Sequence, residues 1–330
     1  MKFGVYTAIL HDRPLPDALA VIRDLGLDAA EINVGGFLPP VHMPTIDEIL
    51  TSDTARDDYL GIFAEAGVEL AGLNANGNPL HPDPHIGPPT LADIDRAIRV
   101  AHRLGQTRVV TMSGLPGASA EAAVPTWIVN PWESSLLDIL DDQWARAVPV
   151  WRDLDRLAAD HGVRIAIEMH PHNLVFNPAT LERLIDAADA ESIGAEMDPS
   201  HLFWQGIDPL AAIDHLGERV VHAAAKDVRI NPAAAIHGVL DDRHTRFTGD
   251  RITRIRGDAA ISRWPAESAW DFVALGRGHD QAFWDRFVAA LHDVDPDMAV
   301  HIEHEDEDLG RIEGLETAAE VLLTARDHVR

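Results

Sequence analysis

Residues 163–204 read VRIAIEMHPHNLVFNPATLERLIDAADAESIGAEMDPSHLFW, and this stretch decides the fold. Two short apolar runs, Val163–Ile167 and Ile193–Met197, predict buried strands. Between them lie a turn rich in Asn and Pro and then the helical pattern Ala179–Ala190. The order strand, loop, helix, strand predicts two parallel strands that a helix connects.

Ionisable side chains follow both of these strands at the point where each should end. Glu168 and His170 follow the first strand, and Asp198 and His201 follow the second. In a parallel α/β sheet, ligands bind at the carboxyl ends of the strands. The four side chains are therefore a candidate site, which the rest of the chain should complete.

The same alternation of strand-like and helical runs extends over the whole chain. The runs that predict strands are Lys2–Thr7, Ala29–Asn33, Glu69–Asn74, Arg108–Met112, Val163–Ile167, Ile193–Met197, Arg219–Lys226 and Met298–Glu303. Eight strands alternating with helices predict one α/β domain over residues 1–330, a (β/α)8 TIM barrel. The rival fold, a doubly wound open sheet, is disfavoured because the sequence lacks GxGxxG.

Three long loops separate the predicted elements. The expected helices are Leu15–Leu25, Ile46–Gly67, Thr90–Leu104, Asp141–Asp160, Ala179–Ala190, Asp208–Leu216, Asp280–Leu291 and Ile312–Asp327. Thr90 is expected to cap its helix. The long loops follow strands three, four and seven. The last of them, residues 228–277, is expected as an insertion over the C-terminal face, with Trp264 or Trp270 near the substrate and a small hairpin around Thr248–Ile255.

The chain is strongly acidic, with 54 acidic and 27 basic residues and a formal net charge of −27. Such a surface repels phosphate backbones, so no nucleic-acid partner is expected. The absence of cysteine excludes disulfides and thiolate metal sites. The sequence begins without a signal peptide and contains no apolar run near the ~18 residues of a membrane span. A cytoplasmic protein without membrane contact is expected.

Four predicted strand ends carry groups that bind metals: Glu168, Asp198, His222 and Glu303. Carboxylates that share one barrel mouth repel each other and raise each other's pKa. A divalent cation removes this repulsion by taking two or three of them as ligands. Oxygen and imidazole ligands suit Mn²⁺, Mg²⁺, Co²⁺ and Zn²⁺, and of these Mn²⁺ is the ion expected here.

Several motifs resemble one known superfamily in order along the whole chain. They are IEMHPHN (167–173), EMDPSH (196–201), VVHAAAKDVR (220–229), GRGHDQAFW (276–284) and HIEHED (301–306). With these motifs the chain resembles the sugar phosphate isomerase/epimerase superfamily, the xylose-isomerase-like TIM barrels that also include AP-endonuclease-like enzymes. The resemblance implies a barrel that binds a divalent metal and acts on a carbohydrate.

The resemblance also implies roles for particular residues. Glu168 and Glu303 would bind the metal and, in epimerases of this type, also move protons. Asp198 would be a further metal ligand, and His201 would touch a substrate oxygen. At the end of strand seven, Lys226 would meet substrate hydroxyls or a phosphate, and Arg229 would do the same.

Other residues complete the expected site from the sequence pattern. His170 shares a strand face with Glu168, so an acid/base role and a structural role are both open. Glu31 lies on a strand inside the barrel pattern and needs a partner such as Lys2. Four tryptophans could wall a sugar or aglycone pocket or could anchor the long loops: Trp127, Trp132, Trp204 and Trp270.

One position departs from the superfamily's pattern. The superfamily usually has His-x-His-x-Lys-Asp on strand seven, and the second histidine, which binds the metal, is Ala224 here. His222 lies on the same strand face but ~6.6 Å deeper. His237 in the following loop is the preferred replacement, because a loop sets no limit on reach. Three protein ligands with water, or no metal, remain alternatives.

The expected function is a metal-dependent sugar isomerase or epimerase that removes a proton next to a carbonyl and forms an enediolate. The same first step permits β-elimination. The alternative is therefore a lyase on 3-keto-glycosides, like the catalytic subunits of C-glycoside deglycosidases, which work with a small partner subunit. The remaining hypotheses are that the protein is an AP endonuclease or that it binds a sugar without catalysis. The sugar, its phosphorylation and the oligomeric state, including a homo-oligomer, stay open.

Overall fold

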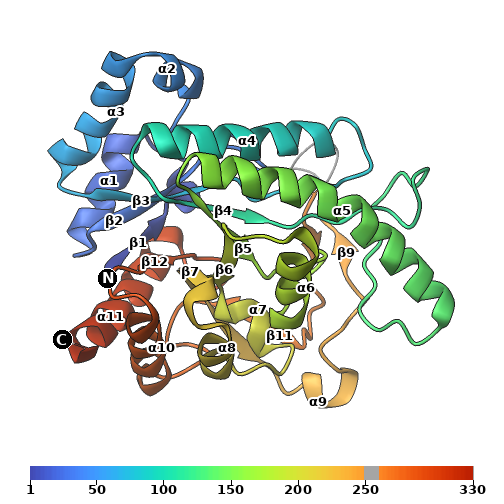
Figure 1. Cartoon of the computed structure of the whole chain (residues 1–330). Coiled ribbons are helices and arrows are strands. Elements are labelled where there is room, and N and C mark those ends of the chain that lie inside the picture. The colour runs from blue at the N-terminus through green and yellow to red at the C-terminus, as the bar shows by residue number, and fades with distance from the viewer. Residues whose placement is uncertain (249–259, 330) are drawn as a thin grey trace.

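The strands of the computed structural model, which describes residues 1–248 and 260–329, close into a parallel barrel (Figure 1). Its strand order is β1-β12-β7-β6-β5-β4-β3-β2. The bounds are β1 Lys2–Tyr6, β2 Ala29–Asn33, β3 Glu69–Asn74, β4 Arg108–Met112, β5 Arg164–Glu168, β6 Ile193–Met197, β7 Val220–Ala225 and β12 Ala299–Ile302. The predicted (β/α)8 TIM barrel is confirmed, because eight parallel strands alternate with surrounding helices.

Helices surround this barrel and connect its strands (Figure 1). Their bounds are α1 Leu15–Asp24, α2 Ile46–Thr51, α3 Asp53–Ala66, α4 Gly87–Arg103, α5 Ser134–Asp160, α6 Pro178–Ala188, α7 Pro199–Phe203, α8 Pro209–Leu216, α9 Ala234–His237, α10 Gln281–Val294 and α11 Arg311–Val329, with 3-10 turns at Thr7–Leu10 and Gly217–Arg219. Within the described residues, no helix is both long and apolar enough to cross a membrane.

The helices differ most from the prediction at three places. The helix predicted over 46–67 is split in two, because Ser52 is extended and its side chain accepts a hydrogen bond from the Ala55 amide to cap α3. The expected cap Thr90 lies inside α4, where its Oγ1 donates to the Ile86 carbonyl at 2.7 Å. Prolines in the first turn start α4 earlier. Helix α5 begins at Ser134, before the predicted Asp141.

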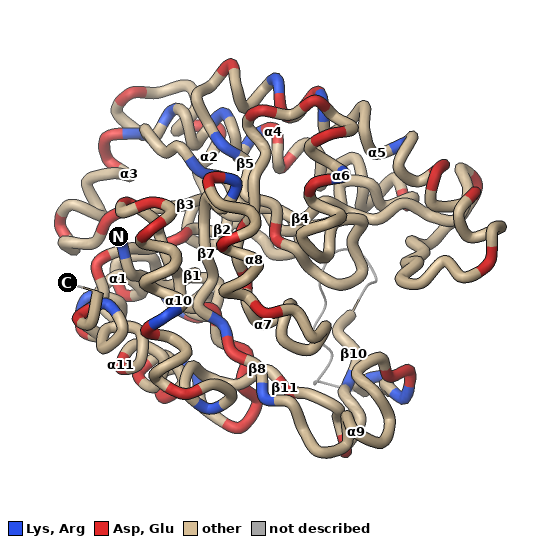
Figure 2. Tube along the Cα trace, turned by 60° about the horizontal axis from the view of Figure 1, so that its bottom comes forward, with Lys and Arg blue, Asp and Glu red and all other residues tan. Residues whose placement is uncertain are grey.

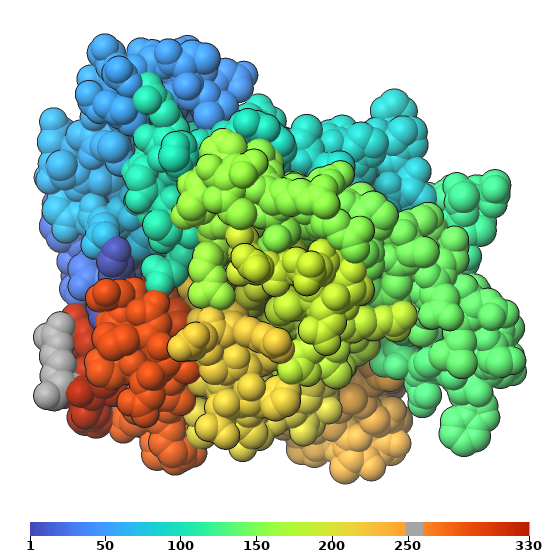
Figure 3. Space-filling view, in the orientation of Figure 1, coloured from blue at the N-terminus to red at the C-terminus, as the bar shows by residue number. Residues whose placement is uncertain are grey.

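The barrel strands are buried on both faces, as parallel strands between helices require. Every residue of β2, β6 and β7 is buried. Charged side chains lie mainly on the surrounding helices and loops, where acidic residues predominate (Figure 2). The N-terminal part of α5 and the loop before it extend beyond the barrel (Figure 3).

The two ends of the segment after β7 pair with each other in a small two-stranded sheet outside the barrel. Strand β8, Asp227–Ile230, pairs antiparallel with β11, Trp270–Val273. The Asp227 carboxylate accepts hydrogen bonds from three backbone amides of the motif Gly276–His279 at 3.0–3.1 Å. Within the insertion, β9 (Thr245–Arg246) pairs with β10 (Ser262–Arg263). Most of the hairpin predicted at 248–255 lies outside the described residues.

Helix α6, which connects the two strands of the opening motif, starts at a capping box. The Asn177 side chain accepts from the Thr180 amide at 3.0 Å, and Thr180 Oγ1 accepts from the Asn177 amide at 3.1 Å. Asn177→Ala is expected to lower the free energy of unfolding by about 1 kcal/mol, because the Thr180 amide loses its side-chain partner. Urea denaturation measures this change. The exposed Asn130→Ala is the control, and an equal loss there would contradict the capping role.

Candidate active site

Three carboxylates from different strand ends meet at the mouth of the barrel. Glu168 is the last residue of β5, Asp198 follows β6, and Glu303 follows β12. One carboxylate oxygen from each lies within 4.8 Å of the other two. Glu168 and Asp198 are buried, and the Glu303 side chain is 10% exposed. This separation allows one cation to contact all three, since such bonds are ~2.0–2.6 Å long.

Glu168 is held on both of its oxygens. Oε1 lies 3.1 Å from His201 Nε2, and Oε2 accepts a hydrogen bond from the Asn76 side chain. Burial raises the pKa of Glu168, but His170, His201 and the Lys226 ammonium outweigh burial and lower this pKa to about 2. Burial lowers the pKa of His170 to about 4. Glu168 is therefore an ionised carboxylate beside a neutral imidazole at neutral pH.

The pKa values of Glu303 and Asp198 are raised, whereas that of Glu168 is lowered. Burial raises the pKa of Glu303 well above its usual value, and Glu168 and Asp198 add to the increase, although Lys226 acts against it. Burial also raises the pKa of Asp198. Lys226 Nζ donates to Glu303 Oε2 at 3.2 Å and to Glu305 Oε1 at 2.7 Å. One ammonium thus faces several buried carboxyl groups, and a further positive charge would stabilise them.

The residues present fit a divalent cation. Asp198 Oδ1 accepts from the Ser200 amide at 2.8 Å, whereas its buried Oδ2 has no hydrogen-bond partner among the described residues. This oxygen lies 3.3 Å from His201 Nε2. A buried carboxylate oxygen without a donor is available to a metal. The donor set of carboxylates and imidazole, with no thiolate, suits Mn²⁺, Mg²⁺, Co²⁺ or Zn²⁺.

Neither histidine proposed to replace Ala224 lies with these carboxylates. His222 is buried deep in the barrel, where its Nε2 lies 2.7 Å from Glu31 Oε2. His237 ends the short helix α9 and is exposed. Among the described residues, the groups that could hold a metal include neither of them together with Asp198 and Glu303. His201 is the imidazole that the structure does bring to Glu168 and Asp198.

The expected partner of Glu31 also needs correction. Glu31 was expected to pair with Lys2, but Lys2 pairs with Glu69 on the exposed outer side of the barrel. Glu31 instead contacts His222 and also His301, whose Nδ1 lies 2.9 Å away. Lys2 begins β1 at the opposite end from the site, so its side chain reaches solvent rather than the barrel interior.

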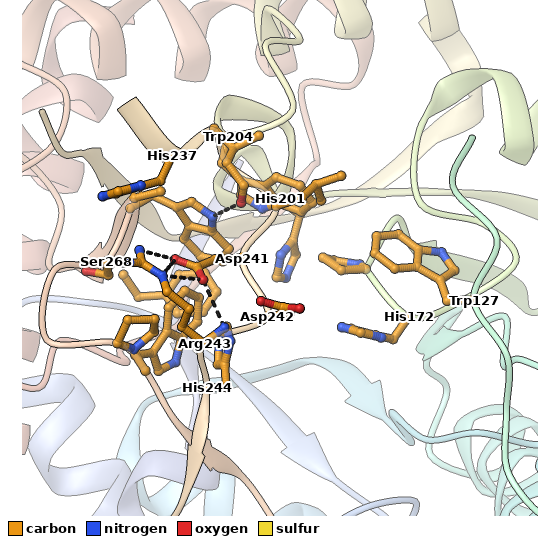
Figure 4. Close-up of a pocket in the computed structure, with 18 of the residues that line it drawn as sticks. Trp127, His172, His201, Trp204, His237, Asp241, Asp242, Arg243, His244 and Ser268 are labelled. Carbon is orange, nitrogen blue, oxygen red and sulfur yellow. Dashed lines mark hydrogen bonds and ion pairs between the residues drawn. The ribbon is translucent and has the colours of Figure 1, made fainter. Parts of the chain in front are cut away.

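A cavity of about 740 Å³ is lined by His170 and by His201, the histidine in contact with Glu168 (Figure 4). Its lining also includes Trp204 and residues of the 228–277 segment, among them Trp264 and Trp270. The insertion therefore contributes walls to the cavity next to the carboxylates. The expected wall residue Trp132 is outside this lining and is 90% exposed.

Arg229 does not face this cavity. Its guanidinium lies 3.3 Å from both the Asp271 carboxylate and the Asn231 side-chain oxygen. It is absent from the cavity lining. Lys226 does lie at the carboxylates, and its Nζ is 4.5 Å from the centre of the Phe272 ring. Of the two expected cationic contacts to substrate, only Lys226 is in position.

Sequence reasoning missed several side chains of the site. Glu196 lies two residues before Asp198 on the same strand face, and burial raises its pKa well above the usual value. The strand alternation could have revealed it. Glu305, the second partner of Lys226, lies two residues after Glu303 in HIEHED. Phe272 and His172 line the cavity without any signal in the sequence.

The chain belongs to the family described as xylose isomerase-like TIM barrel, whose sequence model matches residues 19–325. The Bacillus subtilis (strain 168) relative described as "Uncharacterized protein YfiH" is 34% identical over 327 residues, which cover 98% of both chains. This family lies in the sugar isomerase/epimerase superfamily that the motifs resemble.

Two solved structures show the same fold. The probable 3-DHS dehydratase AsbF of Bacillus anthracis has a TM-score of 0.63 at 15% identity, covering 98% of this chain and 99% of that chain. A D-tagatose 3-epimerase-like protein has a TM-score of 0.62 at 19% identity, covering 100% and 98%. At these identities the likeness shows the fold alone.

Asp198→Ala is expected to weaken Mn²⁺ binding by at least about 10–100-fold. Loss of a residue that only supports a metal ligand typically costs this much, and loss of a direct ligand should cost no less. The measurement is a calorimetric titration of Mn²⁺ into protein freed of metal by a chelator. Asp242→Ala removes an exposed carboxylate of the cavity lining and should bind Mn²⁺ like the wild type. Equal affinity of the two variants would exclude Asp198 as a ligand.

The same titration distinguishes the histidines. His201→Ala is expected to weaken Mn²⁺ binding, because His201 alone of the three lies at Glu168 and Asp198. His222→Ala and His237→Ala are expected to keep the affinity. Loss of binding in His237→Ala alone would show that the exposed loop moves to the metal, as the sequence pattern suggested.

Proposed function

We propose that this protein is a metal-dependent isomerase or epimerase that removes a proton next to the carbonyl of a sugar or sugar-like polyol. The observation that carries the proposal is the meeting of three carboxylates, two of them buried, beside His201 and the cavity that His201 lines. In such a site one carboxylate can remove a proton next to a carbonyl and another can return it. Membership of the family supports a sugar-like substrate.

Different residues of the site have different roles in this reaction. Glu168, Asp198 and Glu303, together with His201, would hold a divalent cation, which when bound supplies polarisation of a carbonyl oxygen. Glu168 removes the proton from the neighbouring carbon, and Glu303 returns a proton to the resulting enediolate. Asn76 and His201 fix the orientation of the Glu168 carboxylate. Lys226 offers its ammonium to the negative charge that develops on the substrate oxygen.

Elimination is the second candidate, because proton removal is also its first step. The cavity favours it by extending beyond the carboxylates, with the rings of His170 and His201 on its wall at a centroid distance of 4.2 Å and tilted by 59°. Elimination also needs a group that gives a proton to the leaving oxygen. The dehydratase among the similar structures is an example of such chemistry on the same fold.

Proton exchange in D₂O tests the proposal. Protein loaded with Mn²⁺ is incubated with a panel of ketoses, keto-glycosides and keto-cyclitols, and NMR follows each hydrogen next to the carbonyl. Isomerisation or epimerisation replaces that hydrogen by deuterium and yields a new sugar. Elimination yields an unsaturated ketone and a released group. A metal-loaded protein that exchanges no hydrogen in the whole panel would refute both functions.

A further inference from the structure

We infer that the site takes an uncharged glycoside, a saccharide joined to a flat apolar group, rather than a sugar phosphate or a free sugar. This inference rests on the proposed function, because it assigns the saccharide part to the carboxylates. The part of the cavity beyond them then defines the rest of the substrate. Its volume of about 740 Å³ falls within the roughly 300–1,000 Å³ of pockets that bury drug-sized ligands.

The cavity has a polar floor and an aromatic upper part. The floor is made by His170 and His201 at Glu168, and by Phe272, which packs under the Lys226 ammonium. The upper part comes from the 228–277 segment, from Trp204 after α7 and from the loop that carries Trp127. Figure 4 shows Trp127 and residues of the 228–277 segment on opposite sides of the cavity. A ligand that reaches both parts is polar at one end and apolar at the other.

Four tryptophans form the upper part. Trp204 and Trp270 stack at a centroid distance of 5.2 Å and are buried, while Trp264 packs edge-on against Trp270 at 4.3 Å. Trp127 and Trp264 are partly exposed and line the cavity. Two large rings that remain partly exposed in a cavity are suited to covering a flat apolar group.

Trp127 contacts a residue in a strained backbone conformation. Its ring lies 4.8 Å from the ring of His172, and His172 has a φ of 59°, in the left-handed region. Such a conformation costs a non-glycine residue of order 1–3 kcal/mol and is found mainly at functional sites. The loop after β5 therefore positions this aromatic wall at an energetic cost.

The remaining wall contains apolar residues beside the tryptophans and polar residues of the 237–244 segment. The apolar ones are Pro171, Val239, Leu240, Pro265 and Ala269, of which Val239 and Ala269 pack with the tryptophans. Trp270 Nε1 already donates to the Val239 carbonyl at 3.2 Å. Against the tryptophans and these apolar residues, a second sugar would bury hydroxyls without partners, which is unfavourable. An apolar group loses no hydrogen bonds in the same place.

The charges of the cavity argue against a phosphate. Arg243 is the arginine in the described lining, and its Nε donates to Asp241 at 2.9 Å. Lys226 is paired with Glu303 and Glu305. A phosphate would thus meet cations that already have partners, and it would also meet the Asp242 carboxylate. An uncharged ligand avoids this repulsion.

Calorimetry with matched pairs of probes tests the inference. Methyl and phenyl β-glycosides of glucose, galactose and xylose are titrated into the Mn²⁺-loaded protein. The phenyl member of at least one pair is expected to bind roughly five- to tenfold tighter than the methyl member, the gain of one aromatic contact. Glucose 6-phosphate is expected to bind no tighter than glucose. Equal affinities within all three pairs, or a tighter phosphate, would overturn the inference.

Variants locate the effect in the aromatic wall. The tighter binding of a phenyl glycoside relative to its methyl partner is called the phenyl advantage. Trp127→Ala and Trp264→Ala are expected to remove most of the phenyl advantage, and Trp127→Phe is expected to keep part of it. Trp132→Ala is the matched control, because Trp132 is 90% exposed and outside the lining. A phenyl advantage that survives both alanine variants would place the apolar group elsewhere and refute this subsite. Cellobiose binding tighter than phenyl glucoside would identify a second sugar instead.

Failure of the proposed function gives a different result. In that case the phenyl advantage and its loss in the tryptophan variants persist, but no keto-glycoside exchanges a hydrogen in D₂O. If the inference alone is wrong, hydrogen exchange occurs with free ketoses and the phenyl advantage is absent. The binding titrations and the exchange experiment therefore fail separately.

Discussion

Glu168→Gln is expected to lower the rate of hydrogen exchange next to the substrate carbonyl by about 10²–10⁴-fold, the usual contribution of a general base. The amide keeps the shape of the side chain but cannot accept the proton. Its oxygen can still contact His201 or Asn76, so the fold of the site is preserved. NMR in D₂O with the best ketose or keto-glycoside of the panel measures the rate.

Glu305→Gln is the matched control for this change. Glu305 lies close to the same site through its 2.7 Å contact with Lys226, but it is half-exposed and is not among the converging carboxylates. We expect its exchange rate to change by less than about tenfold, because Lys226 keeps Glu303 as a partner. Similar losses in both variants would indicate that the negative charge of the mouth, rather than a base at Glu168, supports the reaction.

The strand ends of the site were predictable because of one geometric rule. Parallel barrel strands are short buried runs, so the residue that follows each run lies at the same face of the barrel. Glu168, Asp198 and Glu303 each occupy such a position, and the structure brings their oxygens within 4.8 Å. No knowledge of the strand order was needed, since all eight strand ends point to one mouth.

The partners across the barrel were not predictable in this way. Which side chains meet depends on strand order and register, and these are set by closure of the whole barrel. Glu31 on β2 meets His222 on β7 and His301 on β12, a contact that no local pattern indicates. The position of His237 likewise depends on how a long loop packs. The alternation of side chains along the strand predicted on which face of β7 His222 lies, but it did not predict which side chains His222 contacts.

The cluster of Glu31, His222 and His301 is the second place where a large effect is expected. All three side chains are at most 1% exposed, and His222 Nε2 lies 3.0 Å from His301 Nδ1. Burial raises the pKa of Glu31, but the two histidines outweigh burial and lower it below its usual range. The Asn74 side chain donates to the other Glu31 oxygen at 2.8 Å. Glu31 is thus a buried anion with a complete set of partners.

Glu31→Ala is expected to lower the free energy of unfolding by about 3–5 kcal/mol at pH 7, because removing one member of a buried charged group leaves the others without compensation. Urea denaturation measures the loss. Glu69→Ala breaks the exposed pair with Lys2 and should cost at most about 1 kcal/mol, so equal losses would refute the role of burial. Because the pKa of Glu31 is lowered in the folded state, its contribution is present above its unfolded pKa of about 4.3 and is lost as the pH falls further. The difference in the free energy of unfolding between wild type and Glu31→Ala should therefore become smaller below about pH 4.3. A difference that stays constant with pH would show that the loss comes from packing alone.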